Sequence, residues 1–169
     1  LYACYQECVE KGSCADTFQK IRRRFHSIVS ELGMETFDIE SILNETERAI
    51  EENKSADFTA SRGEYLNARI VAAKLGWAFV DAKDIIFFDK NGRFDESRSY
   101  PLIEKTLSAS GCAVVPGFYG TGADGKIKTF SRGGSDISGS IVARAMNADV
   151  YENWTDVSGF LACDPRIVD

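Results

Sequence analysis

The chain has 169 residues, which is long enough for one domain with a sizeable core or for part of a larger one. Its content of 44% hydrophobic and 27% charged residues is typical of a soluble globular protein. Its formal net charge of -6 and the lack of a long basic run argue against a general nucleic-acid binder. No apolar stretch approaches the roughly 20 residues that span a bilayer, and no signal-peptide pattern follows Leu1. We therefore expect a cytoplasmic protein that binds neither nucleic acid nor membrane.

The first half of the sequence predicts helices at residues 1–9, 17–32 and 39–52. In the second of these, apolar residues recur at spacings of three and four, and Gly33 ends the pattern. A further helix is predicted from Ser61 to Gly76. Ser61 and Glu64 have the spacing of a capping box, which by itself favours a structural role for both side chains.

The second half alternates short apolar runs with helical patterns. Residues 77–81, 85–88, 112–119 and 148–154 predict strands. A helix is expected to start at Ser99-Tyr100-Pro101 and to end at Ser110-Gly111, and another follows Asp136. Residues 126–130 alternate, so 120–125 is predicted to be a hairpin loop. Helices that alternate with short apolar strands predict an α/β domain with a largely parallel sheet.

The cysteines and the histidine predict no metal site. Five cysteines, at positions 4, 8, 14, 112 and 163, form no Cys-x-x-Cys pair, and His26 is the only histidine. We expect the cysteines to be small buried apolar residues in a reducing cytosol. His26 lies beside an apolar helix face with no acid or nucleophile near it in sequence, so we expect a structural role.

The stretch from Phe130 to Asp136 joins a predicted strand to a predicted helix. It contains Arg132, two glycines, Ser135 and Asp136, and either of the last two can cap the helix. Paired glycines let a ligand approach the backbone, and a helix N-terminus favours anions. Arg132 can grip a carboxylate or phosphate through two hydrogen bonds. Spacing alone leaves two interpretations open: an anion site, or a capped turn with one surface arginine.

A second polar segment covers residues 154–166, directly after a predicted strand. Thr155 and Asp156 supply hydrogen-bonding groups, and Arg166 can meet a phosphate. Because the carboxyl ends of parallel strands converge on one crevice, we expect this segment and the 130–136 stretch to lie together. By contrast, residues 120–126 match most of the phosphate-loop pattern, but Ile127 stands where Ser or Thr must bind magnesium, so we predict a plain turn there.

The sequence resembles the catalytic domain of aspartate kinases, in the amino-acid kinase family. Three blocks carry this resemblance, in the same order as in that family: Ser61-Arg62-Gly63-Glu64, residues 130–136 and residues 154–166. The resemblance implies an α/β carbamate kinase-like fold: three α/β/α layers with a mainly parallel open sheet, here incomplete at both ends. It implies an intact enzyme that uses ATP and Mg²⁺ to phosphorylate the β-carboxylate of L-aspartate, giving 4-phospho-L-aspartate for lysine, threonine and methionine biosynthesis. A homodimer is the habit of that family.

The resemblance also implies residue roles. Glu64 would receive the α-amino group of aspartate, and Arg132 would pair with a substrate carboxylate. Asp136 would organise catalytic lysines near the transferred phosphoryl group. The other expected contacts are Ser135 and Phe118 in the substrate pocket, and Thr155, Asp156 and Arg166 on the nucleotide.

The sequence departs from that family pattern in what it lacks. The Lys-Phe-Gly-Gly-Thr-Ser loop, a second nucleotide-side lysine and the ACT domains are missing from these residues. We therefore expect 1–169 to be a partial kinase domain that is inactive alone, with a helix-rich substrate-side portion over about 1–111. Residues from about 112 to 169 would carry the substrate loop and nucleotide segment. The alternatives are another amino-acid or nucleotide kinase of the family, or a non-catalytic ligand-binding or regulatory relative.

Overall fold

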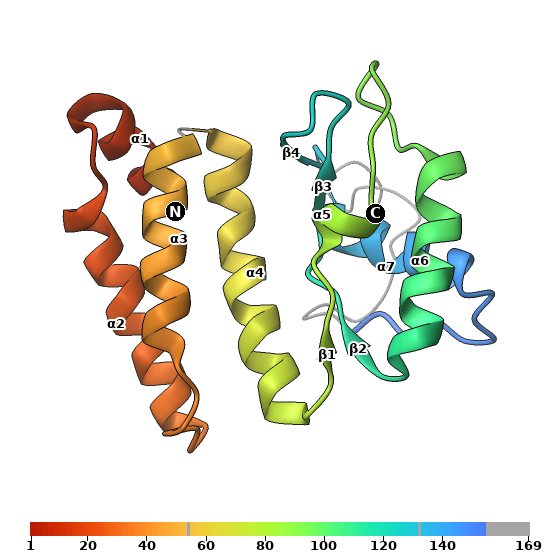
Figure 1. Ribbon diagram of the computed structural model, residues 1–169, viewed down its shortest axis with the longest axis horizontal. Helices are drawn as coiled ribbons and strands as arrows, with labels where there is room; N and C mark the ends of the chain where they lie inside the picture. Colours follow the sequence, from red (N-terminus) through yellow and green to blue (C-terminus); the bar gives the residue numbers. More distant parts are fainter. Residues whose placement is uncertain (54, 132, 155–169) are drawn as a thin grey trace, which may run out of the picture.

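The computed structural model describes residues 1–53, 55–131 and 133–154. Its first half is helical: α1 (Tyr2–Lys11), α2 (Ala15–Glu31), α3 (Ile39–Asn53) and α4 (Ala56–Leu75). Figure 1 shows α2, α3 and α4 side by side. The predicted helices at 1–9, 17–32 and 39–52 are confirmed within two residues at each end.

The helical half encloses a first hydrophobic core. Phe18, Leu43 and Ile50 are fully buried in it, because the apolar stripes of the four helices face one another. Cys4, Cys8 and Cys14 are also buried in this core, as expected, whereas Cys112 is exposed, contrary to that expectation. His26 is structural, since its Nε2 lies 2.7 Å from Oε2 of Glu40 across the α2–α3 junction.

Helix α4 begins earlier than its capping-box pattern predicts. Ser55 is its N-cap, with extended backbone angles and a hydroxyl that accepts from the amide of Phe58 at 3.3 Å. The Ser61 hydroxyl instead donates to the Phe58 carbonyl at 2.6 Å inside the helix. The capping-box interpretation of Ser61 and Glu64 is therefore wrong, because residues 56–60 already continue the helix. This frees the Glu64 side chain from a capping role.

The described part of the second half, up to residue 154, contains short strands and three helices. They are β1 (Ala78–Phe79), α5 (Ala82–Ile85), α6 (Glu96–Ser110), β2 (Ala113–Val114), β3 (Tyr119–Thr121), β4 (Ile127–Thr129) and α7 (Gly134–Ala145). β1 and β2 are parallel, with Ala78 opposite Ala113, and β3 pairs antiparallel with β4, with Tyr119 opposite Thr129. The α/β class is thus confirmed, with mostly helices and a small parallel sheet. The hairpin predicted around residues 120–125 is also confirmed, and with it the plain turn.

Four predicted elements differ from the structure. The strand predicted over 112–119 is interrupted, since β2 covers only Ala113–Val114 and β3 begins at Tyr119. The strand predicted at 85–88 does not form. Ile85 is the last residue of α5, a helix that Asp81 caps by accepting from the Lys83 amide at 3.1 Å. Residues 87 and 88 form only isolated β-bridges. Helix α6 starts at Glu96 because Asp95, ahead of Ser99, is its N-cap. Residues 148–154 form no strand, and none of them pairs with a described strand.

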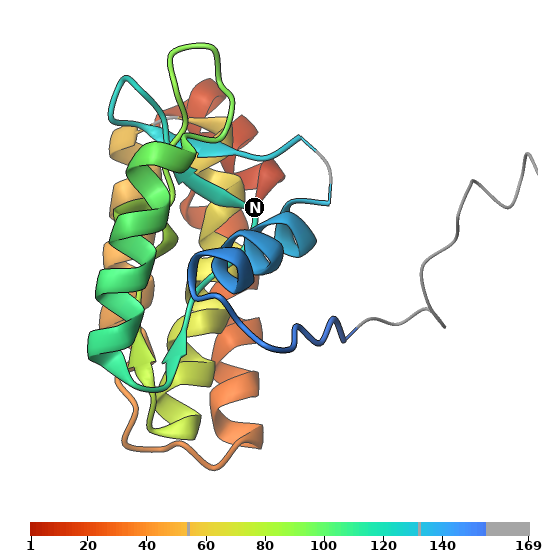
Figure 2. The same cartoon turned by 90° about the vertical axis from the view of Figure 1, so that its right-hand side faces the viewer.

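Helix α4 also contacts the second half of the chain. It packs against β1, β2 and β4, while α6 packs against α7. Figure 2 shows α6 and α7 from the side that faces away from α2 and α3. A second core forms here, with Ile86, Ile103 and Tyr119 fully buried. None of the described helices is both long and apolar enough to cross a bilayer.

Candidate functional site

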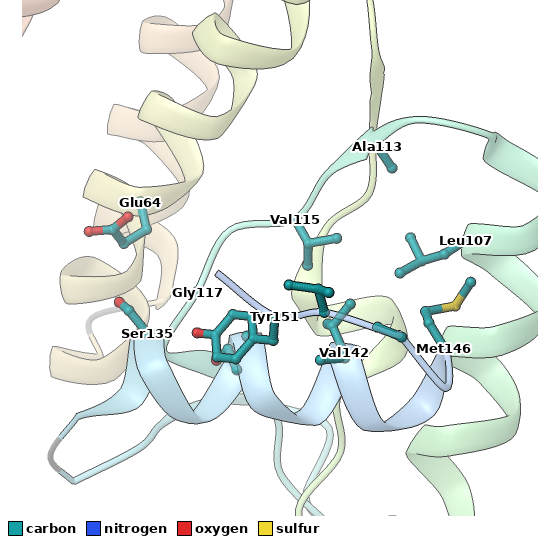
Figure 3. A pocket seen from close by; sticks show the side chains of 14 residues that line it. Glu64, Leu107, Ala113, Val115, Gly117, Ser135, Val142, Met146 and Tyr151 are labelled. Atoms are coloured by element: carbon teal, nitrogen blue, oxygen red, sulfur yellow. The ribbon is translucent and has the colours of Figure 1, made fainter. Parts of the chain in front are cut away.

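A cavity of about 510 Å³ lies where α4, the segment after β2 and α7 meet. Figure 3 shows that its two ends differ in chemistry: Glu64 and Ser135 lie at one end, whereas Leu107 and Met146 lie at the other. Gly117 lines the polar end. The fold therefore brings together a carboxylate and a hydroxyl that are 71 positions apart in sequence (135 − 64).

Glu64 lies in the third turn of α4, on its exposed side. Among the described residues its carboxylate has no ion-pair partner. A carboxylate that lines a cavity without a cation beside it is suited to an ammonium group of a ligand. The substrate role that the resemblance implies for Glu64 stays a prediction.

Ser135 and Asp136 occupy the first turn of α7, but neither caps it. The N-cap is Gly133, in the left-handed region at φ 57°, and no side chain caps the amides. The prediction that Ser135 or Asp136 is the N-cap is therefore wrong. The N-cap lies two residues before Ser135 and three before Asp136, at a glycine that tolerates this backbone conformation. The first-turn amides of α7 remain available to an anion.

The two side chains project into different cavities. Ser135 lines the cavity of Glu64. Asp136 lines a neighbouring cavity of about 310 Å³ together with Tyr100 and Ser140, and accepts a hydrogen bond from Asn153 Nδ2 at 3.2 Å. Tyr151 lines both cavities. The start of α7 thus lies between the cavity that Glu64 lines and a second, largely apolar cavity that Asp136 lines.

Phe118 lies beside the first cavity, in the segment 115–118 that joins β2 to β3 and that we call the strap. Its amide donates to Ser138 Oγ at 2.9 Å, and that hydroxyl donates to the Gly134 carbonyl at 2.7 Å. A Cβ atom on Gly134 would lie only 2.6 Å from the Phe118 Cβ. The strap is therefore fastened directly to the first turn of α7. Sequence reasoning missed Ser138. The available signal was its position four residues after Gly134, because a serine in a helix can donate to the carbonyl one turn earlier.

The other predicted site residues are not placed. Arg132, Thr155, Asp156 and Arg166 lie outside the described residues. Within the described residues, no group of three His, Cys, Asp or Glu side chains is arranged to hold a metal ion. Sequence reasoning also missed Asn153 and Tyr151, because it treated residues 148–154 as a strand.

Known proteins match both the sequence and the fold. The sequence profile described as the amino acid kinase family matches residues 12–169. The chain belongs to the amino acid kinase family. It is 32% identical to Aspartokinase 3 of Bacillus subtilis, in an alignment that covers all of this chain and 40% of the relative. It is 33% identical to the chloroplastic Aspartokinase 1 of Arabidopsis thaliana, over 68% of this chain and 22% of the relative.

Solved structures agree with this assignment. The aspartate kinase of Clostridium acetobutylicum superposes with a TM-score of 0.88 and 48% identity, over 99% of this chain and 39% of that one. Aspartokinase III of E. coli, in complex with lysine and aspartate, gives a TM-score of 0.71 at 23% identity, over 99% of this chain and 42% of that one; it supports the fold. This amino acid kinase chain spans about 40% of the length of the first curated relatives it matches.

Proposed function

We propose that this chain is part of an aspartate kinase domain. The enzyme transfers the γ-phosphoryl group of ATP to the β-carboxylate of L-aspartate and releases ADP and 4-phospho-L-aspartate. The observation that carries the proposal is that Glu64 and Ser135, from two of the three family-like blocks, line one cavity beside Gly117. The aspartokinase names of relatives at 32% and 48% identity support it.

The chemistry of the cavity suits an amino acid with two carboxylates. Glu64 attracts the α-amino group, while Ser135 and the first-turn amides of α7 favour a carboxylate. Phe118 shapes this end of the pocket from the strap, and Arg132 pairs with a substrate carboxylate. The β-carboxylate of aspartate is ionised at neutral pH, so the acceptor needs no general base.

The neighbouring cavity is the proposed nucleotide side. Asp136 organises the groups that stabilise the transferred phosphoryl, and Thr155, Asp156 and Arg166 hold the nucleotide. In such reactions the protein mainly positions two anions and offsets their negative charge. When Mg²⁺ is bound, the substrate phosphates would hold it together with one or two carboxylates, and Asp136 would be a suitable carboxylate for that purpose.

The wider assignments follow from the same proposal. The enzyme acts in the cytoplasm as a homodimer, at the first step towards lysine, threonine and methionine. Residues from 1 to about 111 form the helix-rich, substrate-side portion of the domain, and residues from about 112 to 169 carry the substrate loop and nucleotide segment. The 169-residue polypeptide alone is expected to show little or no turnover.

The test is aspartate-dependent ADP release by the full-length protein that contains this sequence. With Glu64→Gln, the KM for aspartate should rise at least about tenfold, because the ammonium group loses its negatively charged acceptor, while the KM for ATP stays unchanged. Glu10→Gln, at an exposed glutamate of α1, is the matched control. An unchanged KM for aspartate in Glu64→Gln would remove this residue from the site.

Two further outcomes of the same assay would replace the proposal. Turnover with a different amino acid or with a nucleotide acceptor, and none with aspartate, would indicate another kinase of the family. Binding of aspartate or ATP by calorimetry with no turnover in the full-length protein would indicate a non-catalytic ligand-binding relative.

A further inference from the structure

We propose that a buried cluster of Arg62, Tyr119 and Asp81 positions the strap beside Ser135, so that Arg62 and Tyr119 are positioning residues for the amino-acid side of the cavity. The inference rests on the proposed function for the identity of the ligand. It assigns roles to side chains that do not themselves line the cavity.

Tyr119 is the centre of the cluster. It is fully buried, and its hydroxyl donates to Asp81 Oδ1 at 2.7 Å. Asp81 is 7% exposed, caps α5 through the same oxygen, and lies 3.6 Å from the Lys83 ammonium through Oδ2. Burial, and after it the Asp81 carboxylate, raise the pKa of Tyr119 above its ordinary value, so the phenol remains a donor. The hydrogen bond therefore fixes the direction of the Tyr119 ring.

Arg62 lies over the Tyr119 ring. Its side chain is 5% exposed, and its Cζ lies 4.4 Å from the ring centre of Phe58, 4.5 Å from that of Tyr65 and 5.5 Å from that of Tyr119. Nε and Nη2 donate to Ser61 Oγ, and no carboxylate of the described residues forms an ion pair with the guanidinium. Aromatic faces thus replace the usual acid partner.

A buried cation without a carboxylate is costly, and a hydrophobic side chain of similar volume would serve a purely packing role at least as well. Arg62 lies two residues before Glu64 on the same helix, and it stacks on Tyr119, the residue that follows the strap. The cluster therefore ties the helix that carries Glu64 to the strap that contacts Ser135.

The strap depends on such anchoring because its last residue is strained. Phe118 has φ 63°, which is rare for an aromatic residue and persists only where the surroundings hold it. Its amide is held by Ser138 and its carbonyl accepts from the Phe130 amide at 2.9 Å. Directly before it, a Cβ on Gly117 would lie 3.2 Å from Ser135 Oγ. Because Tyr119 directly follows Phe118, a rotation of the chain at Tyr119 would change the distance between Gly117 and Ser135.

The first experiment is a kinetic comparison in the full-length protein. Tyr119→Phe keeps the ring and removes only the hydroxyl. We expect the KM for aspartate to rise about tenfold, with the KM for ATP within about twofold of the wild type, because only the amino-acid side is displaced. Arg62→Met should give a similar split, and Arg62→Lys, which restores the charge without the planar stack, should recover part of it. Tyr2→Phe, at an exposed tyrosine of α1, is the matched control.

The second measurement needs no substrate. Hydrogen exchange of the Phe118 amide in the unliganded protein should be about tenfold faster in Tyr119→Phe than in the wild type, as expected when a local anchor is lost. If the wild-type protein does not use aspartate but this exchange difference is found, the proposed function fails and the positioning role stands. Unchanged exchange together with an unchanged KM for aspartate would overturn the inference. The inference would also be overturned if the KM for aspartate and the KM for ATP rose equally in a variant that is destabilised as a whole.

Discussion

At the scale of single residues, the site depends on places where two backbones nearly touch. Gly134 faces Phe118 so closely that a methyl group would lie 2.6 Å from its Cβ and 2.9 Å from its Cα. The atoms it would meet are near the backbone, so they cannot move aside as the end of a flexible side chain can. A glycine is therefore needed at position 134 because a side chain there would overlap with Phe118.

Gly134→Ala should consequently lower the free energy of unfolding by about 1–3 kcal/mol, the usual cost of overpacking. Gly63→Ala is the matched control, because its Cβ would meet only the Leu1 side-chain end at 3.0 Å and alanine is the better helix former. Urea unfolding of both variants measures the difference. Equal free energies of unfolding for Gly134→Ala and Gly63→Ala would show that the strap can move aside at little cost.

At the scale of secondary-structure elements, helix starts are set by caps that the apolar pattern does not reveal. Ser55, Asp81 and Asp95 each accept a backbone amide of the first turn. Sequence reasoning chose Ser61 and Ser99 instead, because each stands just before a clear structural signal, a glutamate at capping-box spacing or a proline. Neither signal excludes an earlier start.

Ser55→Ala should destabilise the chain by about 1 kcal/mol, since one amide of α4 loses its partner. Ser55→Asp keeps an acceptor at the cap and should retain most of the stability. Thermal or chemical denaturation of the two variants provides the comparison. An unchanged stability of Ser55→Ala would mean that the cap contributes nothing.

The junction of α1 and α2 predicts a pH dependence of stability. Hydrogen bonds from Thr17, and then the contact with Lys11, lower the pKa of Glu7 from its ordinary 4.5. A carboxyl group whose pKa is lower in the folded state stabilises the protein above pH 4.5 and loses that contribution as the pH falls through the folded value.

Glu7→Gln should therefore be less stable than the wild type at pH 7, and the difference should shrink as the pH is lowered below about 4. Glu10→Gln, on the exposed side of the same helix, is the control. Chemical unfolding at a series of pH values measures both. A difference that stays constant with pH would contradict the assignment to the ionised form of Glu7.

At the scale of the whole molecule, the chain has two hydrophobic cores, and α4 belongs to the first while it packs against β1, β2 and β4 of the second half. The first is enclosed by α1 to α4, and the second by the later helices and the strands. The cavity lies on the side of the second core, and α4 contributes Glu64 to it. The rigidity of the substrate end is therefore expected to depend more on the second core than on the first.

Leu43→Ala and Ile103→Ala remove fully buried side chains from the first and second core, respectively. Each should cost about 2–5 kcal/mol, the usual range for a large-to-small change in a core. Native-state hydrogen exchange should then accelerate around α7 in Ile103→Ala, and mainly in α2 and α3 in Leu43→Ala. Uniform acceleration in both variants would show that the two cores unfold as one unit.

The amino-acid sequence by itself determined the long helices, the α/β class, the β3–β4 hairpin and the three family-like blocks. These depend on local periodicity, turn chemistry and motif spacing, which are complete within short stretches of chain. Membership in the amino acid kinase family confirms what those blocks indicated.

Only the tertiary structure decided how those pieces meet. It placed Glu64 with Ser135 in one cavity and Asp136 in the next, and it buried Arg62 against Tyr119. It also left residues 148–154 without the strand that their apolar pattern predicts. The physical reason is the same in each case: contacts between distant segments, and the presence or absence of a pairing partner, outweigh local preference.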